Sequence, residues 1–351
     1  MKKPAAELRN GYTTGSAASA AAVAAFLHSA DPVELLLPGD KTLQIPIHSL
    51  TEHGASVIKD GGDDPDATTG SEVRVELLPF SGAPEDADYI EHADDLELTI
   101  RGGEGIGIVT RPGLAVPPGK YAITPAPRKM IAENLHRAGC SGRWLITISI
   151  PDGAETAKKT LNPVLGIVNG LSILGRTGIV RPYSNAAYAA TIILQMKSAV
   201  ASGKKTAAAV TGSRTADAVL RDFPELSEET VVRIADFIYC AVTAAKNAKL
   251  ETLVIGCMPG KLFKYACGEH NTHAHKIKMN LTKLREFGAE LPGIPLEKMD
   301  SMGELSASIE PEKYLEVLKT IYPYALKNLS QWAGGTKIVL ALYDDSGRRI
   351  L

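Results

Sequence analysis

The spacing of apolar residues changes near the middle of this 351-residue chain. In the first part, short runs that alternate apolar and polar residues predict half-buried, mostly antiparallel strands. In the second part, Thr206–Val210 and Thr252–Gly256 each lead through a loop into a helix, which favours a parallel sheet. We therefore expect an α+β domain with a mixed or antiparallel sheet over residues 1–203, and a Rossmann-like α/β domain with C-terminal helices over residues 204–351.

The individual elements follow from the same patterns. In the first part we expect strands at Val33–Leu37, Thr42–Ile47, Ala55–Lys59, Val73–Leu78, Leu96–Ile100 and Trp144–Ile150, helices at residues 17–27, Arg128–Ala138 and Ser184–Ala201, and an acidic surface loop at Ser81–Asp95. In the second part we expect helices at Thr215–Phe223, Glu228–Ala248, 274–290 and 311–328, and a last strand at Lys337–Tyr343.

Composition excludes several classes of protein. The net charge of −2 provides no basic field for nucleic acid or an anionic membrane, and 5% aromatic residues argue against a surface that stacks bases. The alanine-rich run Ala17–Leu27 lacks a preceding charged segment and a following cleavage site, and it is too short to span a bilayer. We therefore expect a tightly packed helix there and not a signal peptide. Four scattered cysteines show no disulfide framework, and we expect a cytoplasmic protein.

The loop Val57–Gly70 is dense in chemistry, because Lys59 and four carboxylates stand beside the pair Gly61-Gly62 just after a strand. Clustered aspartates coordinate Ca²⁺ or Mg²⁺, but no glutamate closes a twelve-residue EF-hand loop. The glycine pair also allows the backbone to turn toward a polar ligand. A metal site, a ligand-binding loop and a plain acidic turn all remain open from the residues alone.

Two glycine-rich segments imitate nucleotide-binding motifs. Gly102–Gly107 has dinucleotide-type spacing, but Pro112 opposes the helix that must follow, which leaves a hairpin over a ligand or a tight turn. Gly256–Leu262 resembles a P-loop with one spacer too few and without Ser or Thr after Lys261. Its position after a strand still directs backbone N–H groups toward a polar or anionic group.

The remaining candidates are a His/Cys group and two cationic segments. The spacing of Cys267, His270, His273 and His275 matches no standard zinc site, so a polar loop with one functional histidine is the better interpretation. Residues 158–163 and 175–182 supply Lys and Arg without acidic neighbours, among Asn, Thr, Gly and Pro. Such segments are either solvated surface or an ordered wall that binds carboxylates.

Several blocks resemble one known family in their order along the chain. These blocks are residues 11–16 (GYTTGS), 59–66 (KDGGDDPD), 102–107, 127–131, 157–170 (AKKTLNPVLGIVNG), 172–182 (SILGRTGIVRP) and 259–273 (PGKLFKYACGEHNTH). Together they are similar to the cobalt-precorrin-5B C1-methyltransferase family of the anaerobic cobalamin (vitamin B12) pathway. The resemblance covers residues 9 to about 290.

The resemblance implies transfer of a methyl group from S-adenosylmethionine to ring carbon C1 of a tetrapyrrole, with cobalt present only inside that substrate and no metal held by the protein. Positioning and electrostatics then supply most of the rate, without a covalent enzyme nucleophile. The expected proton acceptors are Asp60, Asp63, Asp64 and His273. The expected substrate-binding residues are Thr13, Thr14, Lys59, Arg128, Lys129, Lys158, Lys159, Asn162, Arg176 and Arg181, and Arg111 is a further candidate.

The methyl donor is expected at the carboxyl edge of the parallel sheet, at Thr211, Gly212, Gly256, Gly260 and Lys261, by the general rule for open α/β sheets. Ala17 stands where the family commonly has a cysteine, so catalysis in this chain does not depend on that thiol. A non-catalytic corrinoid carrier and a metal-dependent hydrolase that uses Asp60, Asp63, Asp64 and Asp66 are the competing hypotheses, and the oligomeric state stays open.

Overall fold

The computed structural model describes residues 8–273 and 279–351. Two compact units make up the chain, Met1–Ser184 and Asn185–Leu351. The helix α4 (Asn185–Ala201), which precedes the boundary expected at residue 203, is part of the second unit. The expected mixture of helices and strands in more than one sheet is confirmed, and no helix of the described residues is long and apolar enough to cross a membrane.

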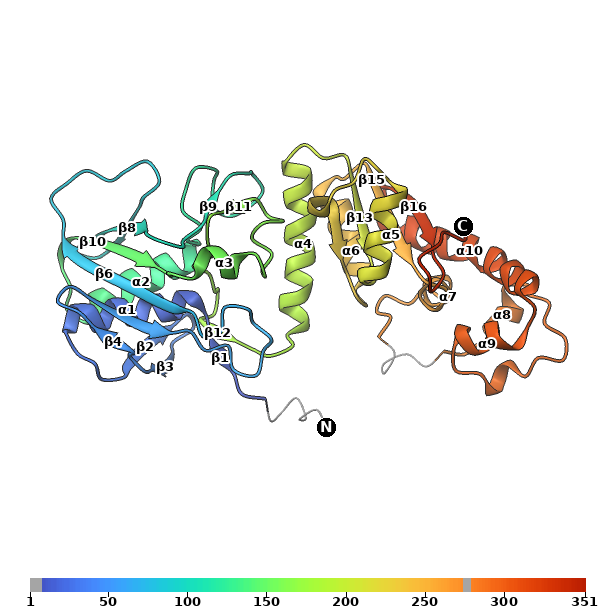
Figure 1. The fold of residues 1–351 in the computed structure, drawn as a ribbon, viewed down its shortest axis with the longest axis horizontal. Coiled ribbons are helices and arrows are strands. Elements are labelled where there is room, and N and C mark those ends of the chain that lie inside the picture. The colour runs from blue at the N-terminus through green and yellow to red at the C-terminus, as the bar shows by residue number, and fades with distance from the viewer. Residues whose placement is uncertain (1–7, 274–278) are drawn as a thin grey trace. The chain divides into compact units, whose positions relative to one another are not determined.

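The first unit is built on a six-stranded mixed sheet (Figure 1). Its strands, in spatial order, are β4 (Ser49–Leu50), β5 (Gly54–Ile58), β6 (Glu72–Pro79), β10 (Gly142–Ser149), β8 (Leu96–Gly102) and β7 (Tyr89–Ala93). Only β10 and β8 pair in parallel, and the other pairs are antiparallel. It follows that β5, β10 and β8 run in the same direction and end at the same edge of the sheet.

Two helices, α1 (Thr14–Leu27) and α2 (Pro125–Arg137), cover one face of this sheet. The pattern of β6 explains why: Val73, Val75 and Leu77 are buried, while the alternate residues Glu72, Arg74 and Glu76 are charged. Helix α1 is buried from Thr14 to Ala24, and its small side chains let it lie close to the strands.

Short elements surround the sheet. These are the hairpin β2 (Val33–Leu37) and β3 (Lys41–Ile45), the antiparallel pairs β1 (Gly11–Tyr12) with β12 (Ile179–Val180) and β9 (Ile108–Val109) with β11 (Ile167–Val168), and the helix α3 (Gly153–Ala157). The labels β1, β12, β9, β11 and α3 gather at one end of this sheet in Figure 1. This is the end at which β5, β8 and β10 terminate.

Backbone packs directly on backbone at Gly105 in this region. Gly105 has φ +72°, and a Cβ added there would lie 1.8 Å from the carbonyl oxygen of Ile150. Cβ atoms added at Gly153 or Gly170 would lie 2.1 and 2.3 Å from the carbonyl oxygen of Gly105. The glycines of the 102–107 segment therefore allow it to touch the segments at residues 150–153 and 170, and neither a nucleotide-binding loop nor an open hairpin accounts for them.

The second unit holds a four-stranded sheet in which all pairs are parallel. Its spatial order is β14 (Val231–Arg233), β13 (Thr206–Val210), β15 (Thr252–Cys257) and β16 (Lys337–Leu342). The helices besides α4 are α5 (Ser213–Asp222), α6 (Ile238–Ala248), α7 (Pro259–Ala266), α8 (Lys283–Glu286), α9 (Met302–Ser308) and α10 (Pro311–Ala333), with 3₁₀ turns at Glu228–Thr230 and Leu296–Lys298.

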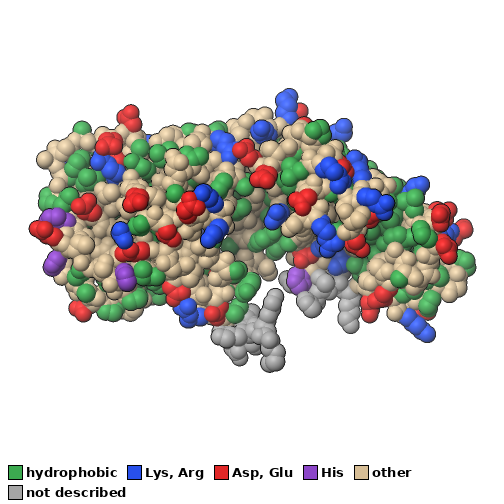
Figure 2. Space-filling view, in the orientation of Figure 1, with side chains coloured by type: hydrophobic (Ala, Val, Ile, Leu, Met, Phe, Trp, Pro, Cys, Tyr) green, Lys and Arg blue, Asp and Glu red, His purple; other side chains and the backbone are tan. Residues whose placement is uncertain are grey.

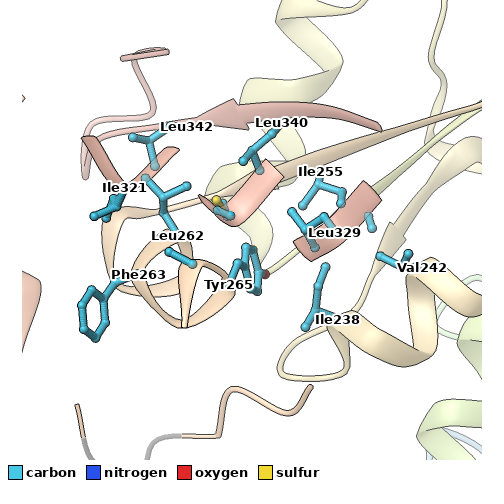
Figure 3. Close-up of a cluster of buried hydrophobic side chains, with 14 of the residues drawn as sticks. Ile238, Val242, Ile255, Leu262, Phe263, Tyr265, Ile321, Leu329, Leu340 and Leu342 are labelled. Atoms are coloured by element: carbon cyan, nitrogen blue, oxygen red, sulfur yellow. The ribbon is translucent and has the colours of Figure 1, made fainter. Parts of the chain in front are cut away.

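Both faces of this sheet are covered by apolar side chains. Ala208, Val210 and Val254 pack with α5 on one face. Ala207, Ala209 and Ile255 face a larger cluster from α4, α6, α7 and α10, part of which is shown in Figure 3. Because the strands are buried on both sides, they appear in the sequence as nearly continuous apolar runs.

Three expected elements were wrong. Glu228–Ala248 is not one helix, because β-branched Val231 and Val232 pair with β13 and Ala235 adopts φ +46°, so that α6 begins only at Ile238. The supposed acidic loop 81–95 contains the edge strand β7. Within 274–290, only Lys283–Glu286 is helical among the described residues, and residues 274–278 lie outside them.

The packing at Gly105 predicts a large effect of one methyl group. Gly105→Ala should lower the free energy of unfolding by about 3 kcal/mol or more, because a close contact with backbone is added to the strain of positive φ. Gly119→Ala is the matched control, since Gly119 has φ +86° and nothing within 4 Å of the added Cβ. Urea unfolding of both variants measures the difference, and equal losses would contradict the packing argument.

Candidate functional site

Of the blocks that resemble one family, those at residues 59–66, 102–107, 157–170 and 172–182 meet at the carboxyl edge of β5, β8 and β10. Residues 59–71, which we call the acidic loop, follow β5, the 102–107 segment begins at the end of β8, and residues 150–172 follow β10. Ser71 Oγ donates to Asp152 Oδ2 at 3.0 Å, and Leu171 N donates to Gly105 O at 2.8 Å. These bonds join all three loops into one cluster, which we call the loop cluster (residues 59–71, 102–110 and 150–182).

The amino end of α1 is fixed to this cluster. Thr13 caps the helix by accepting a hydrogen bond from Ser16 N at 3.2 Å, and Thr14 Oγ1 donates to Ser172 O at 3.0 Å. Leu174 N donates to Thr14 Oγ1 at 3.0 Å, and a Cβ at Gly175 would collide with Thr13. Both threonines are at most 6% exposed. The Thr14 hydroxyl group, together with Thr13 N, which donates to Gly178 O at 3.0 Å, holds residues 172–178 against the helix.

The aspartates of the acidic loop bind other parts of the first unit. The guanidinium of Arg9 forms an ion pair with Asp60 and is the main cause that holds the pKa of Asp60 below its usual range. Asp63 Oδ2 accepts from Arg9 N at 2.8 Å, and Asp64 Oδ1 accepts from Tyr183 N at 2.9 Å. The loop thus connects the segments near residues 9 and 183.

Lys59 is 1% exposed and its ammonium group lies 2.6 Å from Asp66 Oδ2. Burial raises the pKa of Asp66, but hydrogen bonds from Lys59 and Thr68 outweigh it, and the net pKa is lowered. Thr68 donates to Asp66 Oδ1 through both its amide and its hydroxyl group, at 2.8 and 2.7 Å. Lys59 therefore holds the acidic loop from inside. Its pairing with Asp66 could not be read from the sequence.

Asn162 has a similar internal role. It is 6% exposed, its Nδ2 donates to Gly170 O at 3.0 Å, and Ser172 Oγ donates to its Oδ1 at 3.2 Å. These bonds close the segment 162–172 into a loop, with Ile167 N donating to Asn162 O at 2.9 Å. A buried amide that satisfies backbone groups explains why asparagine is needed at this position.

The lysines and arginines expected to bind substrate fall into two groups. The first group contacts other residues of the first unit. Arg128 lies 3.2 Å from Glu91 and stacks over Tyr89 at 3.9 Å, Arg111 donates to the carbonyl groups of Pro163 and Val164, and exposed Lys158 pairs with Glu155. The second group is exposed and forms no ion pair in the described part of the chain: Lys129, Lys159, Arg176 and Arg181. The second group keeps its charge available for an anionic ligand.

Exposed apolar side chains accompany these cations. Leu161, Val168 and Leu174 are 37%, 40% and 48% exposed, and all three lie in the loop cluster. Asn162 bonds to both Gly170 and Ser172, so the chain near residue 162 lies close to the chain near residues 170–172. Charges of both signs are otherwise intermixed on the visible face in Figure 2. The loop cluster thus exposes apolar side chains as well as the cations Lys159, Arg176 and Arg181, a combination suited to an apolar ligand with peripheral acids.

In the second unit, the residues expected to bind the methyl donor lie in the loops that follow its strands. Thr211 and Gly212 follow β13, and Gly212 is the N-cap position of α5. Gly260 and Lys261 open α7, just after β15. Gly256 has another explanation, since its Cβ would lie 2.6 Å from Val219 of α5 and it is therefore a packing residue.

Asp236, Lys261 and Thr272 form a polar network at the same edge. Lys261 Nζ pairs with Asp236 Oδ1 and donates to Thr272 Oγ1 at 2.7 Å, and Thr272 Oγ1 donates to Asp236 Oδ1 at 3.0 Å. Burial tends to raise the pKa of Asp236, but the Lys261 ammonium group and the Thr272 hydroxyl lower it overall. Sequence reasoning missed Asp236 because it placed this residue inside a long helix.

The histidines are arranged differently from a zinc site. His270 stacks on Tyr239 at 4.1 Å and meets the edge of Trp332 at 4.8 Å, while His273 is exposed. His275 lies outside the described residues. Among residues 8–273 and 279–351, no three His, Cys, Asp or Glu side chains lie close enough together to hold a metal ion.

Comparison with known proteins points to one family. The family model CbiD matches residues 1–182, nearly the whole first unit. Cobalt-precorrin-5B C(1)-methyltransferases from Citrifermentans bemidjiense and Polaromonas sp. are 40% and 35% identical to this chain. The alignments cover 84% and 97% of this chain, and 83% and 100% of the relatives. A crystal structure of the cobalamin biosynthesis protein (cbiD) from Archaeoglobus fulgidus is 28% identical, over 74% of this chain and 80% of that one, with a TM-score of 0.40.

The pair Lys59–Asp66 predicts a pH-dependent stability. Asp66→Asn should lower the free energy of unfolding at neutral pH by about 3 kcal/mol, because it leaves a buried ammonium group without its counter-ion. The folded pKa of Asp66 lies below that of an unfolded aspartate, about 3.9. The stabilisation is therefore complete above that value and lost as the pH falls through the folded pKa.

Urea unfolding of the wild type and Asp66→Asn at a series of pH values measures this effect, and the difference should shrink below pH about 4. The double variant Lys59→Met/Asp66→Leu is the control, since removal of both charges should cost less than removal of one. A loss by Asp66→Asn that is small and constant with pH would be evidence against a buried pair.

Proposed function

The chain belongs to the CbiD family, and we propose that it is a cobalt-precorrin-5B C(1)-methyltransferase of cobalamin biosynthesis. The relatives carry this name and align over most of their own length and most of this chain. That agreement is the observation on which the proposal rests. The four cysteines are all free, which suits a reducing cytosol as the place of action.

We propose S-adenosylmethionine as the methyl donor. In the reaction, ring carbon C1 forms a bond to the methyl carbon, the methyl–sulfur bond breaks, and its electron pair stays on sulfur to give S-adenosylhomocysteine. An in-line displacement of this kind needs two correctly oriented reactants and no covalent enzyme nucleophile. The work of the protein is to bind, orient and desolvate them.

The loop cluster of the first unit is the proposed binding surface for the tetrapyrrole. Its exposed Leu161, Val168 and Leu174 would contact the apolar macrocycle. Its exposed Lys159, Arg176 and Arg181, and Lys129 from α2, would pair with the peripheral carboxylates, since they carry charge that no described residue neutralises. Thr13, Thr14, Lys59 and Asn162 support these groups from below, through the hydrogen bonds described above. Cobalt belongs to the substrate and requires no ligand from the protein.

The acidic loop offers proton acceptors next to this surface. Asp63 and Asp64 each use one carboxylate oxygen within the first unit, and their second oxygens accept no hydrogen bond from a described residue. Asp60 is less suitable, because Arg9 contacts both of its oxygens. We propose that Asp63 or Asp64 takes a proton that the ring gives up, with exposed His273 as the alternative.

We further propose that the second unit is a Rossmann-like domain that binds the donor at Thr211, Gly212, Gly260 and Lys261. Support comes from the parallel order β14–β13–β15–β16, in which the chain passes from one side of β13 to the other. Ligands of open parallel sheets bind beyond the carboxyl ends of the strands at such a reversal. Gly256 lies beneath this edge as a packing residue.

Incubation of the purified chain with isotopically labelled S-adenosylmethionine and cobalt-precorrin-5B tests the proposed activity. We expect label in the corrinoid and an equal amount of S-adenosylhomocysteine, both dependent on protein. Asp63→Asn should slow turnover about tenfold or more if Asp63 accepts the proton. Corrinoid binding without any methyl transfer would instead favour a carrier.

Arg176→Ala and Lys159→Ala test the proposed substrate surface. Each should raise the KM for the corrinoid about fivefold to tenfold, because an exposed ion pair with a substrate carboxylate is lost, and should leave the affinity for S-adenosylhomocysteine unchanged. Lys41→Ala is the matched control, since Lys41 is an exposed lysine of β3 outside the loop cluster. If all three variants kept the wild-type KM, the corrinoid would bind elsewhere.

A further inference from the structure

The strand order of the second unit places three chain segments at one edge. After β13 comes Gly212, after β14 comes Asp236, and after β15 comes Lys261. The central strand β13 separates β14 from β15, so the pair of Lys261 with Asp236 reaches across the carboxyl end of β13. Two charged groups thus meet where the chain reverses its direction of winding.

Asp236 uses only one of its two carboxylate oxygens. Oδ1 accepts from both Lys261 Nζ and Thr272 Oγ1, while no group of the described residues donates to Oδ2. The side chain is 23% exposed, and Lys261 is 24% exposed. Lys261 has three N–H donors, of which Asp236 and Thr272 take two. One acceptor and one donor therefore remain side by side.

An adjacent acceptor and donor are the complement of a vicinal diol, because each hydroxyl group can donate one hydrogen bond and accept another. In α/β sheets of this kind an acidic side chain roughly twenty residues beyond the first loop accepts from a ribose hydroxyl group. Asp236 stands in that relation to Gly212. We propose that Asp236 Oδ2 and Lys261 bind the ribose hydroxyl groups of the methyl donor.

Gly212 supports this assignment from the other side. A Cβ added at Gly212 would meet nothing within 4 Å, and its backbone is fully extended, with φ −174° and ψ −177°. Neither packing nor conformation therefore requires glycine at this position. The open space above it leaves room for a ligand to approach the backbone at the start of α5.

Thr272 and Lys264 fix the pair in place. Lys264 is 5% exposed and its Nζ donates to Thr272 O at 2.6 Å, while Thr272 N donates to Asp236 O at 3.1 Å. The residues 264 and 272 thus hold the carboxylate through backbone and side chain together. A preorganised acceptor loses little entropy when a diol binds to it.

This inference rests on the proposed function, since the diol belongs to the donor. The experiment is isothermal titration of the full chain with S-adenosylhomocysteine and with its 2′-deoxy and 3′-deoxy analogues. We expect the wild type to bind at least one deoxy analogue about tenfold or more weakly, as for a lost hydrogen bond to a charged group. Asp236→Asn should weaken the binding of S-adenosylhomocysteine by a similar factor. Its affinities for S-adenosylhomocysteine and the deoxy analogues should differ less than those of the wild type.

Two variants serve as controls. Asp217→Asn changes an exposed aspartate of α5 and should bind like the wild type. Thr272→Val removes the hydroxyl group that positions Oδ1, so it should weaken binding of S-adenosylhomocysteine less than Asp236→Asn does and keep part of the discrimination between ribose and deoxyribose. If circular dichroism shows that Asp236→Asn does not fold, the affinities of the wild type for S-adenosylhomocysteine and its deoxy analogues test the proposal alone.

The outcomes separate the two proposals. Equal affinity of the wild type for S-adenosylhomocysteine and both deoxy analogues would overturn the role of Asp236 and leave the methyltransferase proposal intact. No binding of S-adenosylhomocysteine by the wild type would overturn the donor site and this inference with it. The assignment is supported if affinity falls when Asp236 is replaced and when a ribose hydroxyl group is removed, but not in Asp217→Asn.

Discussion

Direct contact of backbone with backbone at Gly105 is the constraint on which the first unit depends. The loops that follow β8 and β10 meet there, and Gly105, Gly153 and Gly170 lack the Cβ that would keep them apart. Because the loops follow strands that end at one edge, this contact turns separate connections into a single rigid surface. The contact at Gly105 positions the exposed apolar side chains and cations of that surface, although none of them takes part in the contact.

Buried polar pairs complete the same surface from within. Lys59 and Asp66 hold the acidic loop, and Asn162 closes the segment beside it. Some of the residues expected to contact the ligand, such as Lys59 and Asn162, are therefore buried supports, while the expected lysines and arginines that stay exposed are the ligand contacts that we propose. Such a division is physically reasonable, because a charge can be offered to a ligand only where the protein leaves it unpaired.

The sequence predicted most elements of the fold, since strands such as Val33–Leu37 and Thr206–Val210 have clear local patterns. It failed where tertiary pairing overrides local preference, as in β14, whose two valines lie in a stretch with helical spacing. That error also hid Asp236. For the first unit, the sequence pointed to blocks that the structure brings together, but burial of Lys59 and pairing of Arg128 with Glu91 depend on long-range contacts that no local pattern contains.

Division of labour between the units is the central claim: the first binds the corrinoid and the second binds the methyl donor. Hydrogen exchange of the full chain, with and without S-adenosylhomocysteine, tests it most directly. We predict slower exchange at the amides of residues 211–215, 236–239 and 258–262, with little change in residues 157–182. Protection confined to residues 157–182 would contradict the account, because it would place the donor on the loop cluster.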